Sequence, residues 1–390
     1  MPEIISTSKT DLSYIVEVTA GETPATPTFQ SLPIVSGGPV GGKTTAVSET
    51  IRTDRQKTDL VTVDQDVTGD INFELQYNAY KPMLVSLMQG TTVSGTETQV
   101  DIAVDDVART FTSAALADFS AVPAGSYIRT EGFSNAANNG LFRVESATTV
   151  VITVSAQDGS NLVAETAGAS ATIAWGHTPN GTGTPDSYTF KKEVTLATPA
   201  YMYYRGCMIN AMNMSFTTGQ ILSGSISILG LTEDVTETEI AGSSTTAIPA
   251  DALMNSVESL AFSSSGLEAD VQVETASLNY DNGITPAKVI GVLGAAALSP
   301  FTITATGDLT LYFEDISVYT LFLNGTSFSL SFKFNDQNGN SVVFFLPNCQ
   351  FTTVEAPVPG RDQFFMINAS YEALRDPTLG FTMGMNLIDT

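Results

Sequence analysis

The sequence contains few of the side chains on which most catalytic and metal sites depend. Its 390 residues include two cysteines, Cys207 and Cys349, and one histidine, His177. A zinc site needs three or four converging ligands, and a nucleophile activated by histidine needs that histidine held beside it. Because His177 lies in a polar tract rich in Gly and Pro, we expect it to be an exposed loop residue. The sequence therefore predicts no enzyme, and no catalytic, cofactor-binding or metal site.

Carboxylates are abundant, and two alternatives based on them stay open. A pair of acids for glycoside hydrolysis has no local sequence signature. Asp101, Asp105 and Asp106 form a cluster of the kind that calcium accepts, although the order of an EF-hand loop is absent. We expect these acids to be solvated residues of turns and strand ends.

Basic residues are scarce. Lysine and arginine together number 16 against 41 aspartates and glutamates, which gives a net charge of −25. Nucleic-acid binding depends on basic contacts that release counterions from phosphates, so this composition argues against a surface that holds DNA. Such a surface would repel DNA over about 8 Å, the Debye length in physiological salt. The alternative is that the acidity only keeps an abundant protein soluble.

Long apolar runs are also absent. None approaches the roughly 18 residues that a membrane-spanning helix needs. The N-terminus begins Met-Pro-Glu-Ile-Ile and has no basic region followed by an apolar core, so no secretory signal is visible. We expect no membrane partner, and a protein made and assembled in the cytoplasm.

An internal repeat is the main positive feature of the sequence. Residues 68–75 match residues 306–313 at an offset of 238, which aligns Gly69 and Asp70 with Gly307 and Asp308. Residues 187–191 match residues 329–333 at an offset of 142, and the same offset aligns Cys207 with Cys349. Residues 220–222 then match residues 363–365 at 143. The sequence predicts a duplicated module in which the two cysteines are small buried hydrophobic residues.

The two offsets locate an insertion. Their difference, 238 − 142 = 96 residues, has the size of one small domain in the first copy. We therefore predict the following division of the chain: an extended arm over 1–40, a first module over 41–92 and 185–235, an inserted β domain with its linker over 93–184, and a second module over 236–390.

The local patterns favour β structure. Residues 68–77 alternate between apolar and polar side chains, as in a half-buried strand. Residues 78–89 have helical spacing, with Asn78 as a possible N-cap and Gly90 as the stop, and the second copy repeats this pattern up to Gly325. Residues 176–186 are predicted to form a polar linker that returns to the first module.

The motifs and their order resemble those of the tail tube (major tail) proteins of long-tailed bacteriophages. The resemblance covers both modules and is carried by residues 48–56, 59–60, 69–75, 288–291, 312–315 and 376–380. These motifs are structural and not catalytic.

The resemblance implies a mainly β fold with two tandem β-sandwich or barrel-like modules, each with one flanking helix. In that family the sheets join side by side into rings, and the rings stack into a hollow tube through which DNA leaves the capsid. It further implies an acidic lumen that DNA does not stick to, an inserted domain that decorates the outside, and a place in the virion tail. The implied partners are further copies of the chain, a tail terminator, a tape measure protein and baseplate-type proteins.

Duplication affects the number of chains in such a ring. Rings of this family commonly have sixfold module symmetry, so a chain with two modules would need three copies. The resemblance thus leads to the hypothesis of a homotrimeric, pseudo-hexameric ring.

A charged segment is the candidate for contacts between subunits or rings, because three of the few basic residues fall within six positions. Its members are Glu49, Arg52, Asp54, Arg55, Lys57 and Asp59. Opposed charges can set the register between repeated copies, whereas the simpler alternative is a solvated hairpin. The N-terminal arm is a second candidate for contacts between stacked rings. The alternative function is a secreted or surface β-domain adhesin or fibre-type binding protein.

Overall fold

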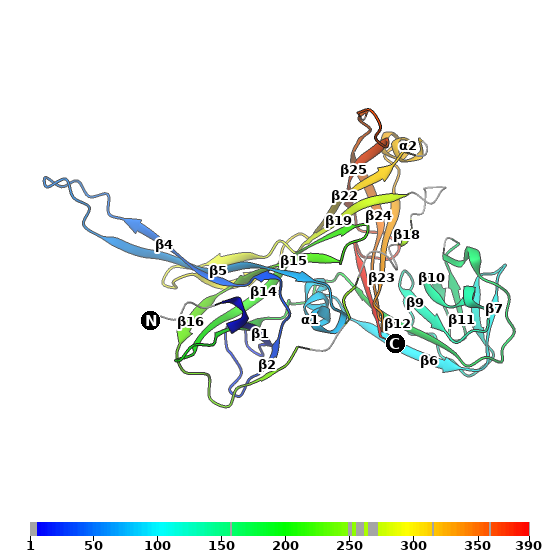
Figure 1. The fold of residues 1–390 in the computed structure, drawn as a ribbon, viewed down its shortest axis with the longest axis horizontal. Coiled ribbons are helices and arrows are strands. Elements are labelled where there is room, and N and C mark those ends of the chain that lie inside the picture. The colour runs from blue at the N-terminus through cyan, green and yellow to red at the C-terminus, as the bar shows by residue number, and fades with distance from the viewer. Residues whose placement is uncertain are drawn as a thin grey trace.

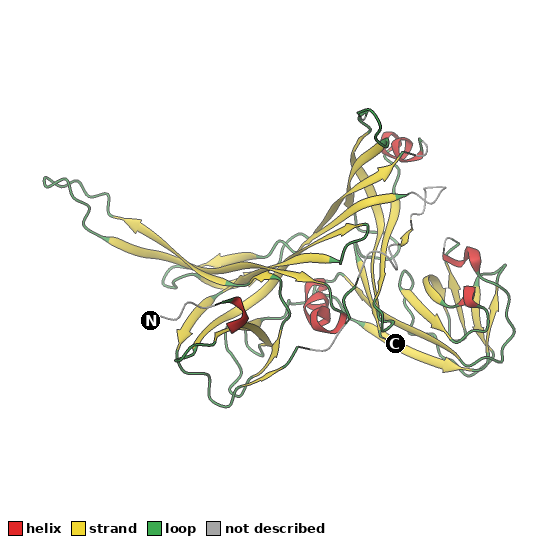
Figure 2. Ribbon diagram, viewed as in Figure 1, coloured by secondary structure: helices red, strands yellow, loops and turns green. Residues whose placement is uncertain are grey.

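The computed structural model describes residues 6–156, 158–248, 252–254, 261–263, 272–313, 316–358 and 360–389. Over these residues the chain is mainly β, as predicted, with two α-helices (Figures 1 and 2). Three 3-10 turns are also present: η1 (Thr7–Lys9), η2 (Ala136–Asn138) and η3 (Asp158–Asn161).

One long antiparallel sheet runs through the molecule. Its order is β4 (Val40–Val47), β5 (Leu60–Glu74), β15 (Ser223–Gly230), β14 (Ala200–Thr217), β19 (Val273–Asp281), β22 (Thr304–Tyr312), β25 (Met366–Ala373) and β24 (Ser341–Glu355). The short β3 (Ser36–Gly37) extends β4 along β5. The sheet is therefore continuous across both copies of the repeat.

Second layers cover one face of this sheet. The first consists of β13 (Tyr188–Val194), β1 (Thr10–Val16), β2 (Thr28–Ser31), β16 (Thr232–Thr236), β17 (Ser244–Thr246) and the first half of β14. The second consists of β23 (Phe328–Asn335), β18 (Ala261–Ser263), β26 (Gly384–Ile388) and the first half of β24. One apolar core lies between the layers; for example, the rings of Phe216 and Phe332 are 4.9 Å apart. The additional hairpin β20 (Thr285–Lys288) and β21 (Ala295–Ser299) follows β19.

The two copies of the repeat pair their strands in the same register. Asp70 of β5 lies opposite Ser227, and Asp308 of β22 lies opposite Ser370. The β-bulge after Ile209 in β14 returns after Phe351 in β24, at the offset of 142. The repeat in the sequence therefore corresponds to a repeated strand arrangement in the structure.

One part of the proposed alignment is wrong by two residues. Tyr188 pairs with Cys207, whereas Phe328 pairs with Cys349, so β13 corresponds to β23 at an offset of 140 and not 142. The reason is the length of the hairpin loop. The loop between the paired residues Phe334 and Val342 is two residues longer than the loop between their equivalents Val194 and Ala200. The cysteines themselves remain equivalent.

The glycines of the repeat have the same steric role in both copies. A Cβ on Gly307 would lie 2.1 Å from the carbonyl oxygen of Ser277, and a Cβ on Gly69 would lie 2.3 Å from that of Gly38. Both distances are far below van der Waals contact, so only glycine fits where the neighbouring strand passes so close.

Most of the proposed N-terminal arm belongs to the first module. Strand β1 pairs with β13 along its whole length, and Leu12 and Tyr14 are buried in the core. Their burial depends on a strand about 180 residues away, which the local Pro-rich and Gly-rich composition conceals. Residues 1–5 lie outside the described part of the chain.

The helices follow the predicted segments with small shifts. Helix α1 (Tyr77–Met88) begins before the proposed cap Asn78, with Gln76 at the N-cap, and Gln89 ends it in a left-handed conformation one residue before Gly90. Helix α2 (Ser317–Asn324) ends at Gly325, as predicted.

The inserted segment forms a small all-β unit. Its strands are β6 (Val93–Gln99), β7 (Ile102–Asp105), β8 (Thr110–Ser113), β9 (Tyr127–Glu131), β10 (Gly140–Ala147), β11 (Val151–Val154) and β12 (Ala171–Pro179). They enclose a separate core that includes Phe111, Val144 and Trp175. Residues 176–179 are part of β12 and not of a linker, and residues 177–179 pair with β26 of the second module.

Candidate functional site

The exposed side of the long sheet carries mostly polar side chains. Directly paired residues share a face, so alternate positions of six neighbouring strands project to the same side. We call this surface the polar face; it consists of Thr68, Asp70, Asn72, Glu74, Ala211, Asn213, Ser215, Thr217, Ser223, Ser225, Ser227, Leu229, Thr275, Ser277, Asn279, Asp281, Thr304, Thr306, Asp308, Thr310, Asn368, Ser370 and Glu372.

The polar face follows from the alternation in the sequence. Between Asp70 and Asn72 lies Ile71, which is fully buried, and the same two-residue period holds along β15 and β22. The apolar positions pack against the second layers, so the polar ones remain in solvent. Fold and surface character are set by the same pattern.

The equivalent strands β5 and β22, which contain Asp70 and Asp308, supply equivalent carboxylates to the polar face. The Ser370 Oγ donates a hydrogen bond of 2.7 Å to Asp308 Oδ1, and the Asp308 backbone N–H donates one of 2.9 Å to Ser277 Oγ. Between the two strands lies a groove of about 480 Å³ lined in part by Asn72, Asn213 and Asn279. The groove is open to solvent, and its lining combines the apolar residues Val35, Phe73 and Met214 with hydroxyl and amide side chains and the carboxylate of Glu74.

The polar face has carboxylates but no cation. Its five charged members are all aspartate or glutamate, and none of the residues that define it is lysine or arginine. A phosphate near this face finds no basic partner and is repelled by the carboxylates.

The six residues proposed for subunit contacts meet at the tip of the β4–β5 hairpin, which projects far from the body (Figure 1). All six are exposed. Arg52 Nη2 lies 2.8 Å from Asp54 Oδ2, and this hydrogen-bonded contact lowers the pKa of the Asp54 carboxyl. The three acids and three bases balance, so the tip carries no net charge.

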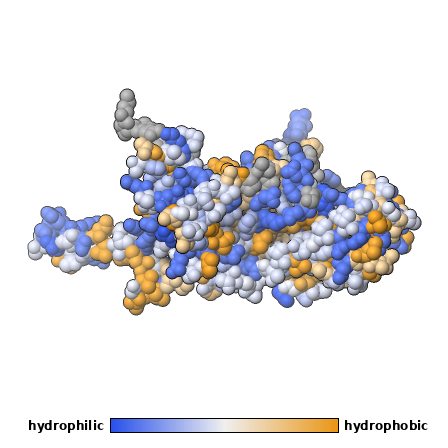
Figure 3. All heavy atoms as spheres, turned by 90° about the horizontal axis from the view of Figure 1, so that it is seen from below, coloured by the Kyte–Doolittle hydropathy of each residue, from blue (hydrophilic) through white to orange (hydrophobic). Residues whose placement is uncertain are grey.

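The hairpin also exposes apolar side chains, both within its charged tip and behind it. Ile51 is 98% exposed, and Val40, Leu60, Val61 and Val63 are each more than half exposed. Figure 3 shows hydrophobic patches and a hydrophilic tip on this projection, at the left of the view. A long, mixed and exposed hairpin of this kind is typical of a segment that contacts another molecule.

The structure corrects the expectation for His177. Its side chain is buried in β12 and its Nδ1 lies 2.9 Å from Asn386 Oδ1 in β26. Burial lowers the pKa of the imidazole to about 4. The contact with Asn386 links β12 of the insert to β26.

Both cysteines are buried and free, as the repeat suggested. Burial raises the pKa of each thiol, which keeps both protonated and unreactive. They pack as small hydrophobic residues.

The acidic cluster in the insert caps turns. Asp101 Oδ2 accepts hydrogen bonds from Ser113 Oγ and from two backbone N–H groups, and Asp105 Oδ1 accepts two from the following turn. No group of three potential metal ligands converges anywhere in the described ranges. Likewise, no described helix is long and apolar enough to cross a membrane.

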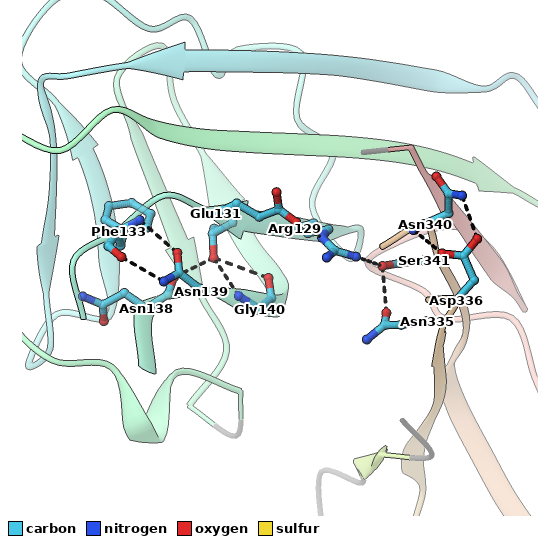
Figure 4. Close-up of polar contacts among 11 residues, drawn as sticks. Arg129, Glu131, Phe133, Asn138, Asn139, Gly140, Asn335, Asp336, Asn340 and Ser341 are labelled. Atoms are coloured by element: carbon cyan, nitrogen blue, oxygen red, sulfur yellow. Dashed lines mark hydrogen bonds and ion pairs between the residues drawn. The ribbon is translucent and has the colours of Figure 1, made fainter. Parts of the chain in front are cut away.

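Sequence reasoning missed the contact between the insert and the second module. Arg129 Nη1 donates a hydrogen bond of 2.8 Å to Ser341 Oγ, which donates in turn to Asn335 Oδ1 (Figure 4). Lys333 and Asp158 form a buried ion pair across the same junction. These partners are far apart in the sequence, and no local pattern marks them.

Comparison with known proteins supports the resemblance. The family model described as phage tail tube protein matches residues 7–373, nearly the whole chain. A comparison with curated proteins found no match. Because the family match spans both halves of the long sheet and the insert, the chain belongs to the phage tail tube protein family.

Proposed function

We propose that copies of this bacteriophage tail protein assemble as stacked rings whose inner wall is the polar face, and that the resulting tube conducts DNA during ejection. The observation that carries the proposal is the polar face itself. It is continuous through both modules and contains five carboxylates without any basic residue. A wall of this chemistry excludes the salt links that would slow a moving polyanion.

Duplication determines the proposed number of chains. Each chain supplies two equivalent sheets already joined at β14 and β19. A ring with six modules then contains three chains, which gives a homotrimer with pseudo-sixfold symmetry. The family is a structural one, so we propose no enzymatic activity and no cofactor.

The β4–β5 hairpin is the proposed contact between stacked rings. It combines exposed apolar residues such as Ile51 with charges of both signs at the tip. Apolar area would supply the stability of the contact, while Arg52, Arg55 and Lys57 with Glu49, Asp54 and Asp59 would set its register.

The insert is proposed to decorate the outside of the tube. It contacts β23, β24 and β26, and β23 packs on the apolar side of the long sheet through Phe332. The insert thus lies on the side opposite the polar face. We further propose assembly in the host cytoplasm without a membrane, and tail terminator, tape measure and baseplate-type partners.

Electron microscopy of the purified protein tests the function. At high protein concentration we expect hollow tubes built from rings, and symmetry averaging should count three chains per ring. Six chains per ring would contradict the trimer. Tubes whose lumen is lined by the second layers would contradict the role of the polar face.

A further inference from the structure

The junction between the two modules inside one chain shows how two such modules join. Residues 211–217 of β14 pair antiparallel with residues 275–281 of β19, so that Ala211 lies opposite Asp281 and Thr217 opposite Thr275. Two further backbone bonds extend this ladder: Asn282 N–H donates to the Asn210 carbonyl at 2.9 Å, and Thr218 N–H donates to the Glu274 carbonyl at 3.4 Å.

The two outer edges of the long sheet are the counterparts of the two strands in this junction. β24 is equivalent to β14 at an offset of 142, including the bulge. The β3–β4 edge is equivalent to β19 at an offset of 239, because Val40 pairs with Thr68 as Asn279 pairs with Thr306. Within the described residues, neither β3 and β4 nor β24 beyond Cys349 pairs with any strand on its outer side.

We propose that the second half of β24 in one copy pairs antiparallel with the β3–β4 edge of the next copy, in the register of the internal junction. We add 142 to the residue numbers of β14 and subtract 239 from those of β19. The pair Asn213–Asn279 then becomes Glu355 opposite Val40, and the pair Met212–Tyr280 becomes Val354 opposite Gly41. The occupant of each edge is thus a second copy of this chain. The inference rests on the proposed function and adds to it a residue-level register for the contact between copies.

The backbone donors of β24 fit this register. In the internal junction the N–H groups that face β19 belong to the even-numbered residues of β14, as the bonds of Asn210 and Thr218 show. Their counterparts in β24 are Thr352, Val354 and Ala356, which all have an N–H group. Pro357 corresponds to Ser215, whose N–H faces β15, so this proline removes no donor from the outer edge. It does explain why the pairing of β24 with β25 stops at Glu355.

The β3–β4 edge fits except around Gly37–Pro39, where Gly37 and Gly38 have φ values of +90° and +124° and the Pro39 carbonyl accepts a hydrogen bond of 3.1 Å from Lys192 Nζ. Gly37, Gly38, Gly41 and Gly42 leave room for a close strand. Pro39 corresponds to Leu278, whose backbone N–H faces β14. Because proline has no backbone N–H, the ladder has one hydrogen bond fewer at this position than the internal junction. The contact between copies should be the weaker of the two.

Lys43 gains a partner under the same register. Its counterpart is Asn282, whose side chain donates a hydrogen bond of 2.8 Å to the Leu87 carbonyl near the end of α1. The left-handed C-caps Gln89 and Gly325 are equivalent, so the counterpart of Leu87 is Leu323, in the last turn of α2 of the neighbouring copy. A lysine ammonium is favoured at the carbonyl end of a helix, so Lys43 replaces the amide of Asn282 with a charge.

Disulfide trapping tests the register. Val40 and Glu355 are exposed and belong to a non-hydrogen-bonded pair, the geometry with the shorter separation between Cα atoms, about 4.5 Å. The variant Val40→Cys with Glu355→Cys should, after mild oxidation of assembled protein, give covalent oligomers up to the number of chains in one ring. Cys207 and Cys349 are buried and do not compete. The two single variants should stay monomeric on a non-reducing gel.

A matched control displaces one cysteine along the same strand and face. Thr44→Cys with Glu355→Cys moves the thiol four residues, roughly 13 Å, and should not cross-link. Equal cross-linking of this control, or none in the first variant while the parent protein forms rings, overturns the register and leaves the proposed function intact. A parent protein that never self-associates overturns both.

Hydrogen exchange on the unmodified protein gives a second measurement. On assembly, the amides of Val354, Ala356 and Gly41 should become protected, by about tenfold or more if the ladder forms as in the internal junction. Unchanged exchange at these amides in assembled rings contradicts the proposal even if the cysteine variants fail to fold.

Discussion

Asn386 Oδ1 accepts hydrogen bonds from two parts of the chain, the Nδ1 of His177 and the backbone N–H of Tyr127, each at 2.9 Å. Because the backbone N–H can only donate, Oδ1 is the acceptor and His177 Nδ1 carries a proton. One side chain of β26 therefore joins β12 and β9 of the insert to the second module. The insert is fixed at this junction by buried polar contacts.

The buried imidazole predicts a loss of stability in mild acid. The pKa of His177 falls from 6.5 to about 4 on burial, so as the pH drops the unfolded state takes up a proton before the folded state does. Its contribution is complete above pH 6.5 and is lost as the pH falls to 4, by up to about 3 kcal/mol. Urea unfolding against pH should show this loss in the parent and a smaller one in His177→Asn. Parallel curves for the two proteins would contradict the assignment.

The buried pair of Lys333 and Asp158 predicts strong coupling across the junction. Their side chains are 8% and 6% exposed, so replacing one partner leaves an unpaired charge without solvent. Lys333→Met or Asp158→Leu alone should cost about 3–5 kcal/mol, and the double variant should cost less than the two together. Chemical denaturation measures this cycle. Arg52→Gln, at the exposed pair on the hairpin tip, is the control and should leave stability unchanged; additive costs in the cycle would exclude coupling.

The repeat glycines predict equal sensitivity in the two modules. Gly69→Ala and Gly307→Ala each place a methyl group within 2.3 Å of a backbone oxygen of the neighbouring strand. Each should lower the free energy of unfolding by about 1–3 kcal/mol, the usual cost of overpacking. In Gly360→Ala the nearest atom is 3.4 Å away, and little change is expected. A tolerated Gly307→Ala would mean that the strands can separate at this point.

Charge on the polar face predicts the behaviour of DNA in the tube. Ser227→Lys with Ser370→Lys introduces cations at equivalent positions of the two modules and should slow DNA ejection, with recovery at high salt. Val107→Lys, on an exposed turn of the insert, adds charge away from this face and should have no such effect. Ejection rates of reconstituted virions at several salt concentrations distinguish these outcomes. Equal slowing by both variants would exclude a role for the polar face.

Local periodicity predicted the strand through Asp70, both helices and the repeat, because these depend on side chains adjacent in sequence. The placement of His177 depends on β26, 209 residues later, and that of Tyr14 depends on β13. A tract rich in Gly and Pro can still form a strand when a distant edge is available, and local composition does not reveal the partner. The polar face was predictable only strand by strand, since its continuity requires the order of the sheet.

The pairing of β14 with β19 has a kinetic consequence. Two modules on one chain meet at an effective concentration on the order of millimolar, whatever the dilution of the protein. Their contact therefore forms with folding, whereas a contact between separate chains depends on how many chains the cell has made. In the proposed ring, every second junction between modules lies within one chain and forms before assembly starts. Only the junctions between chains depend on the concentration of the protein.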